Sequence, residues 1–127
     1  MRAKLIAALA VLALVAALCA ASLHEMASVC AEMENLRGRA LAAERAGDGA
    51  GAEDALRRMQ RLWDGSEKTL EILTTHASLA QVERQLIESR SWLEAGERPH
   101  FRMSMALLGD ALKQAYDLQA PILSYIL

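Results

Sequence analysis

Apolar residues recur along this chain at helical spacing, and the longest apolar run lies near its beginning. Arg2 and Lys4 precede nineteen residues, 5–23, that include no charged side chain. Nineteen helical residues rise about 28 Å at ~1.5 Å each, close to the ~30 Å hydrocarbon core of a bilayer. A basic flank before an apolar run is typical of membrane targeting. We therefore expect residues 5–23 to contact membrane lipid, with a cytoplasmic N-terminus and an extracytoplasmic remainder.

Three interpretations of residues 1–23 stay open: a retained transmembrane anchor, a cleaved signal peptide and a lipoprotein signal. Signal peptidase requires small residues at two positions before its cleavage site. Cleavage after Ala21 would place Cys19 and Ala21 there, and cleavage after Ser22 would place Ala20 and Ser22 there. A lipoprotein signal normally has a small residue before its cysteine, whereas Leu18 precedes Cys19. We favour the anchor, because an apolar stripe continues past residue 23 without a turn signal before Gly47. The stripe comprises Leu23, Met26, Val29, Met33, Leu36, Ala40 and Ala43.

Residues 24–127 form a segment long enough for one domain with a modest core. Glycine, proline and polar breaks divide this segment into four helical stretches, and it contains no alternating β-branched run. The breaks lie at Gly47–Gly51, at Thr74–Ser78 and between Gly96 and Pro99. We predict an all-α fold, in which the anchor or signal helix at 1–23 is followed by an antiparallel three- to four-helix bundle at 24–127.

Each helix of the predicted bundle has an apolar face. We expect a second helix at about 52–75 with Gly65 as its weak point, and a third that starts at Ser78 as N-cap with Gln81 as its capping-box partner. Pro99 lies in the first turn of a fourth helix, which closes at Ala120–Pro121. The expected buried positions are Ala55, Leu56, Met59, Leu62, Trp63, Leu70 and Leu73 in the second helix, Leu79, Val82, Leu86, Ile87 and Leu93 in the third, and Phe101, Met105, Leu108, Leu112 and Ala115 in the fourth.

The charge balance argues against nucleic-acid binding. Beyond residue 23, twelve basic side chains stand against sixteen acidic ones, a net charge of about −4. A nucleic-acid surface needs an excess of positive charge to displace phosphate counterions. We expect the basic cluster of Arg57, Arg58 and Arg61 to form local ion pairs with Glu53 and Asp54 at helical spacing.

Sulfur-containing side chains are expected mainly in the core. Cys30 is the only thiol beyond residue 23, so residues 24–127 cannot form an internal disulfide. A buried apolar role is the favoured interpretation of Cys30, and an intermolecular disulfide is the alternative. We expect adaptable core packing from Met26, Met33, Met59, Met103 and Met105.

The three histidines are the candidate bases or metal ligands, and none lies in a catalytic pattern. His24 lacks the second histidine of the H-E-x-x-H metalloprotease motif, and His100 is expected at the surface. His76 is expected to cap the second helix, and the alternative is an enzyme that uses His76 with Glu71. No G-x-S-x-G sequence occurs, and no lysine follows Gly47–Gly51. We predict no catalytic residue, no cofactor and no metal.

Two regions are candidates for contact with a partner. Trp63 is expected in the core, whereas Trp92 falls beside the apolar stripe and is expected at the bundle edge. The segment after Pro121 is apolar, so we expect it to fold back onto the bundle or to meet a partner. The candidate partner contacts are Trp92, Tyr125, Ile126 and Leu127.

Taken together, these elements resemble a family of short Gram-positive bacterial proteins grouped as domain of unknown function 4363. The residues that carry the resemblance are Gly47-Asp48, Trp63, His76, Arg84, Gly96, Phe101 and the apolar run 122–127. Two features depart from the family pattern: no acidic residues lie beside the break after His76, and the glycine-rich insert after Asp48 is long. The resemblance implies a membrane-anchored helical domain of unknown activity, and it supplies no catalytic residue.

We therefore expect a single-pass protein of the cell membrane with an interaction, scaffolding or modulating role in the bacterial envelope. Its partner would be another protein or a second copy of the chain, and nucleic acid is not expected. A helical binding module released by signal peptidase is the second hypothesis, and an envelope enzyme is the third.

Overall fold

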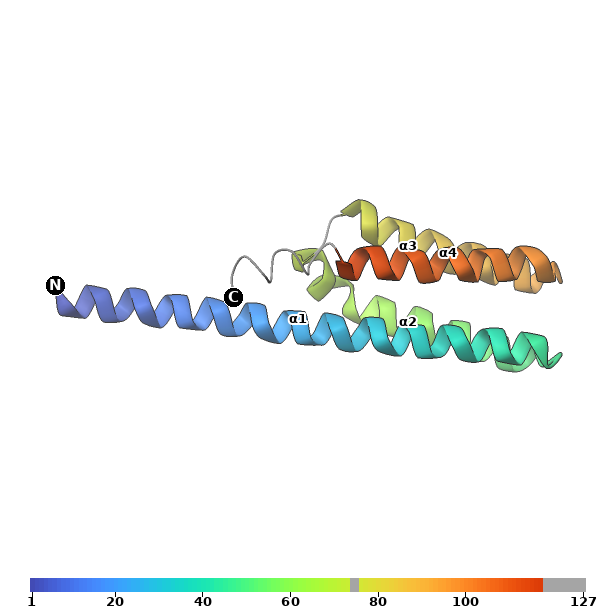
Figure 1. The fold of residues 1–127 in the computed structure, drawn as a ribbon, viewed down its shortest axis with the longest axis horizontal. Helices are drawn as coiled ribbons and strands as arrows, with labels where there is room; N and C mark the ends of the chain where they lie inside the picture. Colours follow the sequence, from blue (N-terminus) through green and yellow to red (C-terminus); the bar gives the residue numbers. More distant parts are fainter. Residues whose placement is uncertain (74–75, 118–127) are drawn as a thin grey trace.

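A computed structural model describes residues 1–73 and 76–117, and all regular structure in these residues is helical. Four helices follow one another: α1 (Arg2–Arg45), α2 (Gly49–Leu73), α3 (His76–Glu94) and α4 (Arg98–Asp117). Figure 1 shows that the N-terminal half of α1 extends beyond the other three helices. The prediction of an all-α fold, with a long apolar N-terminal helix followed by a helical bundle, is confirmed.

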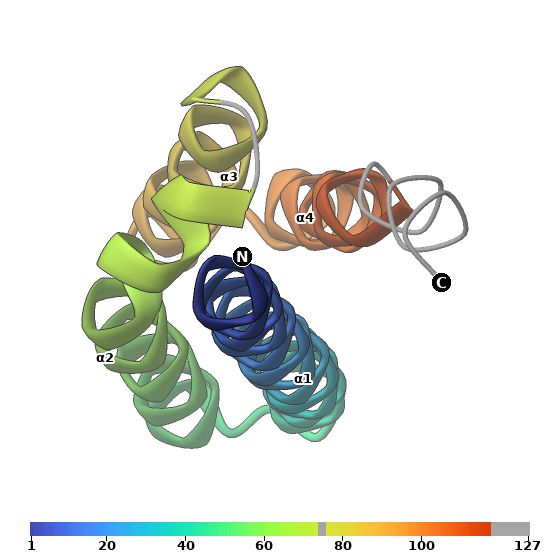
Figure 2. The same ribbon diagram turned by 90° about the vertical axis from the view of Figure 1, so that its left-hand side faces the viewer.

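The helices form two antiparallel hairpins that lie side by side. α1 packs along α2, and α3 packs along α4. The hairpins meet where α1 contacts α4 and where α2 contacts α3, so the helices follow chain order around the bundle (Figure 2). The two contacts between the hairpins are less extensive than the contacts within them.

α1 changes character along its length. Its large apolar side chains from Leu5 to Leu18 are 50–66% exposed, and its first buried side chain is Met26. The exposed half is long and apolar enough to cross a membrane, a property that a membrane anchor and a signal sequence share. The structure therefore shows an apolar helix that protrudes uncovered from the bundle it leads into.

The bundle core comes from one face of each helix, much as the periodicity predicts. Trp63, Phe101, Met33, Met59 and Met105 are among its largest buried side chains. All five expected positions of the fourth helix are buried, as are Ala55, Leu56, Met59, Trp63 and Leu70 of the second and Leu79, Val82 and Leu86 of the third. The side chain of Leu73 lies outside the described residues.

Two apolar residues predicted in the core lie on the surface. Ile87 is 58% exposed and Met103 is 64% exposed. Ile87 directly follows the buried Leu86, and one residue rotates a helix by about 100°, which carries Ile87 off the buried face. Met103 lies two residues after the buried Phe101, on the opposite side of α4. The predictions for Ile87 and Met103 are therefore wrong.

Two predicted helix starts are also wrong by two or three residues. α2 begins at Gly49 instead of Ala52, because Asp48 caps it: the Gly51 N–H donates to Asp48 Oδ1 at 2.9 Å, and the Ala52 N–H to the Asp48 carbonyl at 3.1 Å. The side-chain cap stabilises a first turn that contains two glycines. α3 begins at His76, so Ser78 has a helical backbone inside the first turn and is not the N-cap.

The two hairpins share one turn structure at an offset of 49 residues. Gly47 and Gly96 have φ of +76° and +72°, a conformation that favours glycine. The Gly47 N–H donates to Glu44 O and the Asp48 N–H to Ala43 O, and the same bonds recur from Gly96 to Leu93 and from Glu97 to Trp92. Both turns are Schellman motifs, which satisfy the last carbonyls of a helix.

The 49-residue offset also relates the buried positions of α2 and α4. The six buried positions of α2 from Ala52 to Ser66 are Ala52, Ala55, Leu56, Met59, Trp63 and Ser66. Their counterparts in α4 are Phe101, Ser104, Met105, Leu108, Leu112 and Ala115, and all six are buried. The bundle is therefore a structural repeat of one helical hairpin, although the residues at equivalent positions differ.

A buried carboxylate joins the two hairpins at the end of the bundle far from the apolar segment. Glu44, 4% exposed, accepts hydrogen bonds from Arg98 Nε at 2.5 Å and from Arg102 Nε at 3.0 Å. Arg98 Nη2 also donates to the Glu44 carbonyl at 2.6 Å, near the end of α1. The hydrogen bonds from Arg102 and Arg98 hold the pKa of Glu44 below its ordinary value of 4.5.

Glu44→Gln should lower the melting temperature at pH 7 and weaken the loss of stability in acid. Because the folded-state pKa of Glu44 is depressed, its contribution is complete above the unfolded value near 4.5 and is lost as the pH falls through the folded pKa. Thermal unfolding followed by circular dichroism between pH 7 and pH 3 measures this. Glu88→Gln, at an exposed position of α3, is the control. Equal acid sensitivity in Glu44→Gln and the native chain would contradict the assignment.

Two glycine substitutions should change stability in opposite directions. Gly47→Ala should destabilise the fold by about 1–2 kcal/mol, because φ is +76° there. Gly65→Ala should stabilise it by up to about 1 kcal/mol, because Gly65 lies inside α2 with nothing within 4 Å of an added Cβ. Urea unfolding of both variants, with the native chain as reference, checks the two signs.

Candidate functional site

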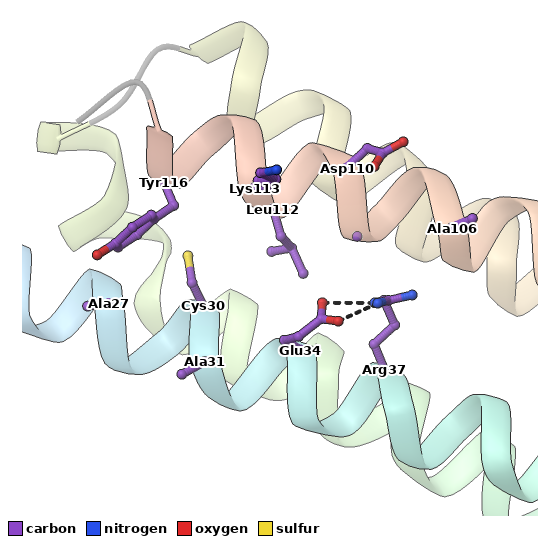
Figure 3. A pocket seen from close by; sticks show the side chains of 11 residues that line it. Ala27, Cys30, Ala31, Glu34, Arg37, Ala106, Asp110, Leu112, Lys113 and Tyr116 are labelled. Atoms are coloured by element: carbon purple, nitrogen blue, oxygen red, sulfur yellow. Dashed lines mark hydrogen bonds and ion pairs between the residues drawn. The ribbon is translucent and has the colours of Figure 1, made fainter. Parts of the chain in front are cut away.

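The described residues form a groove with a mixed apolar and polar lining between α1 and α4, which we call the α1–α4 groove. Its volume is about 730 Å³, within the range of about 300–1,000 Å³ typical of ligand pockets. The α1 wall comprises Ala27, Cys30, Ala31, Glu34 and Arg37, and the α4 wall Ala106, Gly109, Asp110, Leu112, Lys113 and Tyr116. Figure 3 shows the two helices as opposite walls, with Cys30 and Leu112 pointing into the space between them.

Small side chains on both helices leave the space of the groove open. Ala27 and Ala31 lie one helical turn apart on α1, and Ala106 and Gly109 lie three residues apart on α4. Ala27 is four residues beyond Leu23, or about 6 Å along the helix. The groove therefore begins close to the point where the apolar segment of α1 ends.

Charged side chains give the groove a polar border. Arg37 forms an ion pair with Glu34, and its Nη1 donates to the Met105 carbonyl of α4 at 3.4 Å. An added Cβ at Gly109 would lie 2.9 Å from Arg37 Cζ, so the absence of a side chain there lets the guanidinium rest against α4. The hydrogen bond to Glu34 raises the pKa of Arg37, which stays charged. This arrangement can hold an apolar ligand and offer hydrogen-bond partners at its edges.

Cys30 is half-buried in the groove and packs against the hydrophobic core. Burial raises the pKa of its thiol to about 11. A thiol with such a pKa is almost entirely protonated at neutral pH and is a poor nucleophile. Its position therefore supports the predicted apolar role of Cys30 and not a reactive one.

Trp92 occupies the edge position that its spacing predicts, at the far end of the bundle. It is half-buried against the core, and its ring stacks on His100 with centroids 4.4 Å apart. Trp92 also lines a second, smaller concavity of about 270 Å³ beside the two glycine turns. The other candidate partner contacts, Tyr125, Ile126 and Leu127, lie outside the described residues. The structure therefore does not bring Trp92 to the α1–α4 groove.

The histidines do not assemble a catalytic group in the described part of the chain. His76 is exposed and is the first residue of α3, so it is not in the predicted position of a cap on α2. No described residue forms a hydrogen bond or ion pair with it. His100 is exposed and lies 3.7 Å from Glu97, and His24 is exposed on α1. No group of three or more metal-ligating side chains occurs among the described residues.

Arg57 and Arg58 of the basic cluster in α2 pair locally, as their spacing predicts, whereas Arg61 forms no ion pair within the described residues. Arg57 lies 3.4 Å from Glu53 and Arg58 lies 3.0 Å from Asp54, each pair four residues apart on the helix. All four side chains are about half exposed, so these pairs contribute little to stability.

Sequence reasoning did not find the α1–α4 groove or the burial of Glu44. The spacing of the small residues Ala27 and Ala31 was a usable signal, because a four-residue repeat places them on one helix face. Glu44 follows Ala40 by four residues on the apolar stripe of α1, so a charged side chain there indicates a buried ion pair.

Comparison of the chain with family models, with curated proteins and with solved structures finds no match. The resemblance to domain of unknown function 4363 therefore stays a prediction.

Cys30 should react with iodoacetamide about a hundredfold more slowly than an exposed cysteine at pH 8. The reason is the thiolate fraction, because a pKa near 11 lies about two units above the ordinary value of 9.0. Alkylation is followed by mass spectrometry in a Cys19→Ser background, so that Cys30 is the only thiol. The urea-unfolded chain is the control and should react at the ordinary rate. Equal rates for the folded and unfolded chains would contradict the burial of this thiol.

Proposed function

We propose that this protein is a membrane-anchored helical module that binds another envelope protein through the α1–α4 groove. The observation that carries the proposal is the continuity of α1. Its uncharged, exposed half leads without a break into the half that forms one wall of the groove. Arg2 and Lys4 before the apolar run favour a cytoplasmic N-terminus and an extracytoplasmic bundle.

A protein partner is favoured over a small-molecule substrate by the shape and lining of the groove. It is open along the side of the bundle, and exposed Tyr116 lies at its border. Apolar floors with charged borders and an aromatic residue are typical of protein-binding surfaces. The enzyme hypothesis built on His76 and Glu71 has little support, because His76 is exposed without a polar partner among the described residues.

Membership of domain of unknown function 4363 is part of this proposal. Gly47 and Gly96, which carry the resemblance, hold the two equivalent turns, and Trp63 and Phe101 are core residues. These positions support a shared architecture. They assign no activity.

Release by signal peptidase is the alternative, and it is supported by the same exposed apolar helix. An intact mass of the exported protein separates the two. The full-length mass in the membrane fraction supports an anchor, and loss of about the first twenty-one residues rules it out.

Partner binding is tested by a photoreactive benzoylphenylalanine at Ala106, in the wall of the groove. In native membranes this probe should form adducts with one defined protein, whereas the same probe at Ala42, exposed on α1 outside the groove, should not. Ala31→Trp, which fills the groove from the opposite wall, should reduce the Ala106 adduct at least fivefold. Equal adducts from positions 106 and 42, or no effect of Ala31→Trp, would overturn the groove as the binding surface.

A further inference from the structure

Four charged residues line the α1–α4 groove, two on each wall. Glu34 and Arg37 lie on α1, and Asp110 and Lys113 lie on α4. Glu34 and Arg37 pair with each other, three residues apart on one helix. Asp110 and Lys113 form no ion pair within the described residues. The α4 wall therefore carries one negative and one positive side chain that the described residues leave unpaired.

The two walls carry opposite charges at each level along the groove. An added Cβ at Gly109 would lie 2.9 Å from Arg37 Cζ, so Asp110, the next residue, lies at the level of Arg37. α1 and α4 run in opposite directions, so three residues back to Glu34 and three residues on to Lys113 are the same step of ~4.5 Å toward the apolar segment. Figure 3 shows this order, with Lys113 and Glu34 at one level and Asp110 and Arg37 at the next. Each level thus has one acidic and one basic side chain, on opposite walls.

Anchoring in one bilayer restricts how two copies of the chain can meet. Because the apolar half of α1 precedes the bundle in every copy, two anchored copies are parallel, and a twofold axis that relates them runs along the membrane normal. Residues at one level of a copy then meet residues at the same level of its partner. When two grooves face each other across this axis, α1 of each copy lies opposite α4 of the other.

Two grooves that face each other in this way are complementary in charge. The partner's Asp110 lies at the level of Arg37, and the partner's Lys113 lies at the level of Glu34, so both contacts are attractive. The twofold symmetry forms the same two contacts a second time. The intrahelical pair of Glu34 and Arg37 is thereby extended at both ends into a row of four alternating charges.

Small side chains allow the two grooves to approach each other. Ala31 and Ala106 are exposed on opposite walls, and Tyr116 is 46% exposed at the border. Cys30 and Leu112 point into the groove (Figure 3). Contact with a second copy would remove these apolar surfaces from water. The groove therefore combines an apolar interior with border charges that match a copy of itself, which is the composition of a protein–protein interface.

We propose that the occupant of the α1–α4 groove is a second copy of this chain, bound groove to groove as a parallel dimer in the membrane. The inference rests on the proposed function and deepens it, because it names the envelope protein that the groove binds. Asp110 and Lys113 hold α1 of the other copy through the partner's Arg37 and the partner's Glu34. Confinement of both chains to one membrane raises their effective concentration, which favours dimers held by a contact of modest affinity.

The test uses the purified full chain, with benzoylphenylalanine at Ala106, in phosphatidylcholine vesicles that contain no other protein. Half of the chains carry heavy nitrogen, so that mass spectrometry identifies a link between two copies. Irradiation should give a dimer linked from position 106 to α1 of the other copy. Lys113→Glu should lower the dimer yield about tenfold, because two equivalent contacts change from attraction to repulsion. Lys68→Glu, the same change at an exposed position of α2, is the matched control and should leave the yield unchanged.

Exchange of the two charges provides a second measurement. Glu34→Lys combined with Lys113→Glu should restore the dimer, because the exchanged charges attract each other again across the interface. Circular dichroism of each variant checks that the helix content is unchanged, so that a loss of dimer is not a loss of fold.

Four results would overturn the inference: no dimer in these vesicles, links to α2 or α3 of the other copy, equal yields for Lys113→Glu and Lys68→Glu, and no recovery in the folded double variant. Native membranes separate failure of this inference from failure of the proposed function. There, an adduct of position 106 with a different protein would keep the groove as a binding surface and overturn the second copy as its occupant. Absence of any adduct would overturn both.

Discussion

The arrangement of the described residues depends on α1, because its first half is apolar and exposed and its second half packs in the bundle. It runs for 44 residues, or about 66 Å, without a break between its exposed apolar half and its buried half. The stripe that begins at Met26 packs against α2 and α4, whereas the large apolar side chains from Leu5 to Leu18 are exposed in the described part of the chain. With no linker between the two halves, the direction of the apolar segment and the direction of the bundle are coupled. A continuous helix of this kind keeps the groove at a fixed distance along α1 from the end of the apolar run.

The bundle itself is a hairpin used twice, and its two copies are joined unequally. Within each hairpin a Schellman turn and a continuous apolar face bring the helices together. Between the hairpins the contacts are sparser, and the Glu44 carboxylate with Arg98 and Arg102 supplies a polar link at the far end. Burying a carboxylate is costly unless it is paired, and here two guanidinium groups from α4 satisfy both oxygens. The link therefore ties the start of α4 to the end of α1.

The α1–α4 groove follows from side-chain size at a few positions. Larger residues at Ala27 and Ala31 would fill the space that the structure leaves open, and a larger residue at Gly109 would displace the Arg37 guanidinium. The polar border is built from both helices, and the Arg37 guanidinium reaches across to the α4 backbone. The groove thus combines an apolar interior with directional groups at its edge, as binding surfaces for extended segments do.

Local chemistry in the sequence determined the helical class, the turns and most of the core. Spacings of three and four residues predicted the buried faces of α1, α2 and α4, and glycine located the turns at Gly47 and Gly96, because these features act within one or two helical turns. Ile87 and Met103 were misplaced because an apolar residue beside the stripe carries no sign of which face the fold covers. Only the tertiary structure decided that Glu44 is buried, that Cys30 lines a groove and that the hairpins repeat. Each of these depends on which distant helix lies opposite, and the pattern within one helix does not identify the residues more than fifty positions away that pack against it.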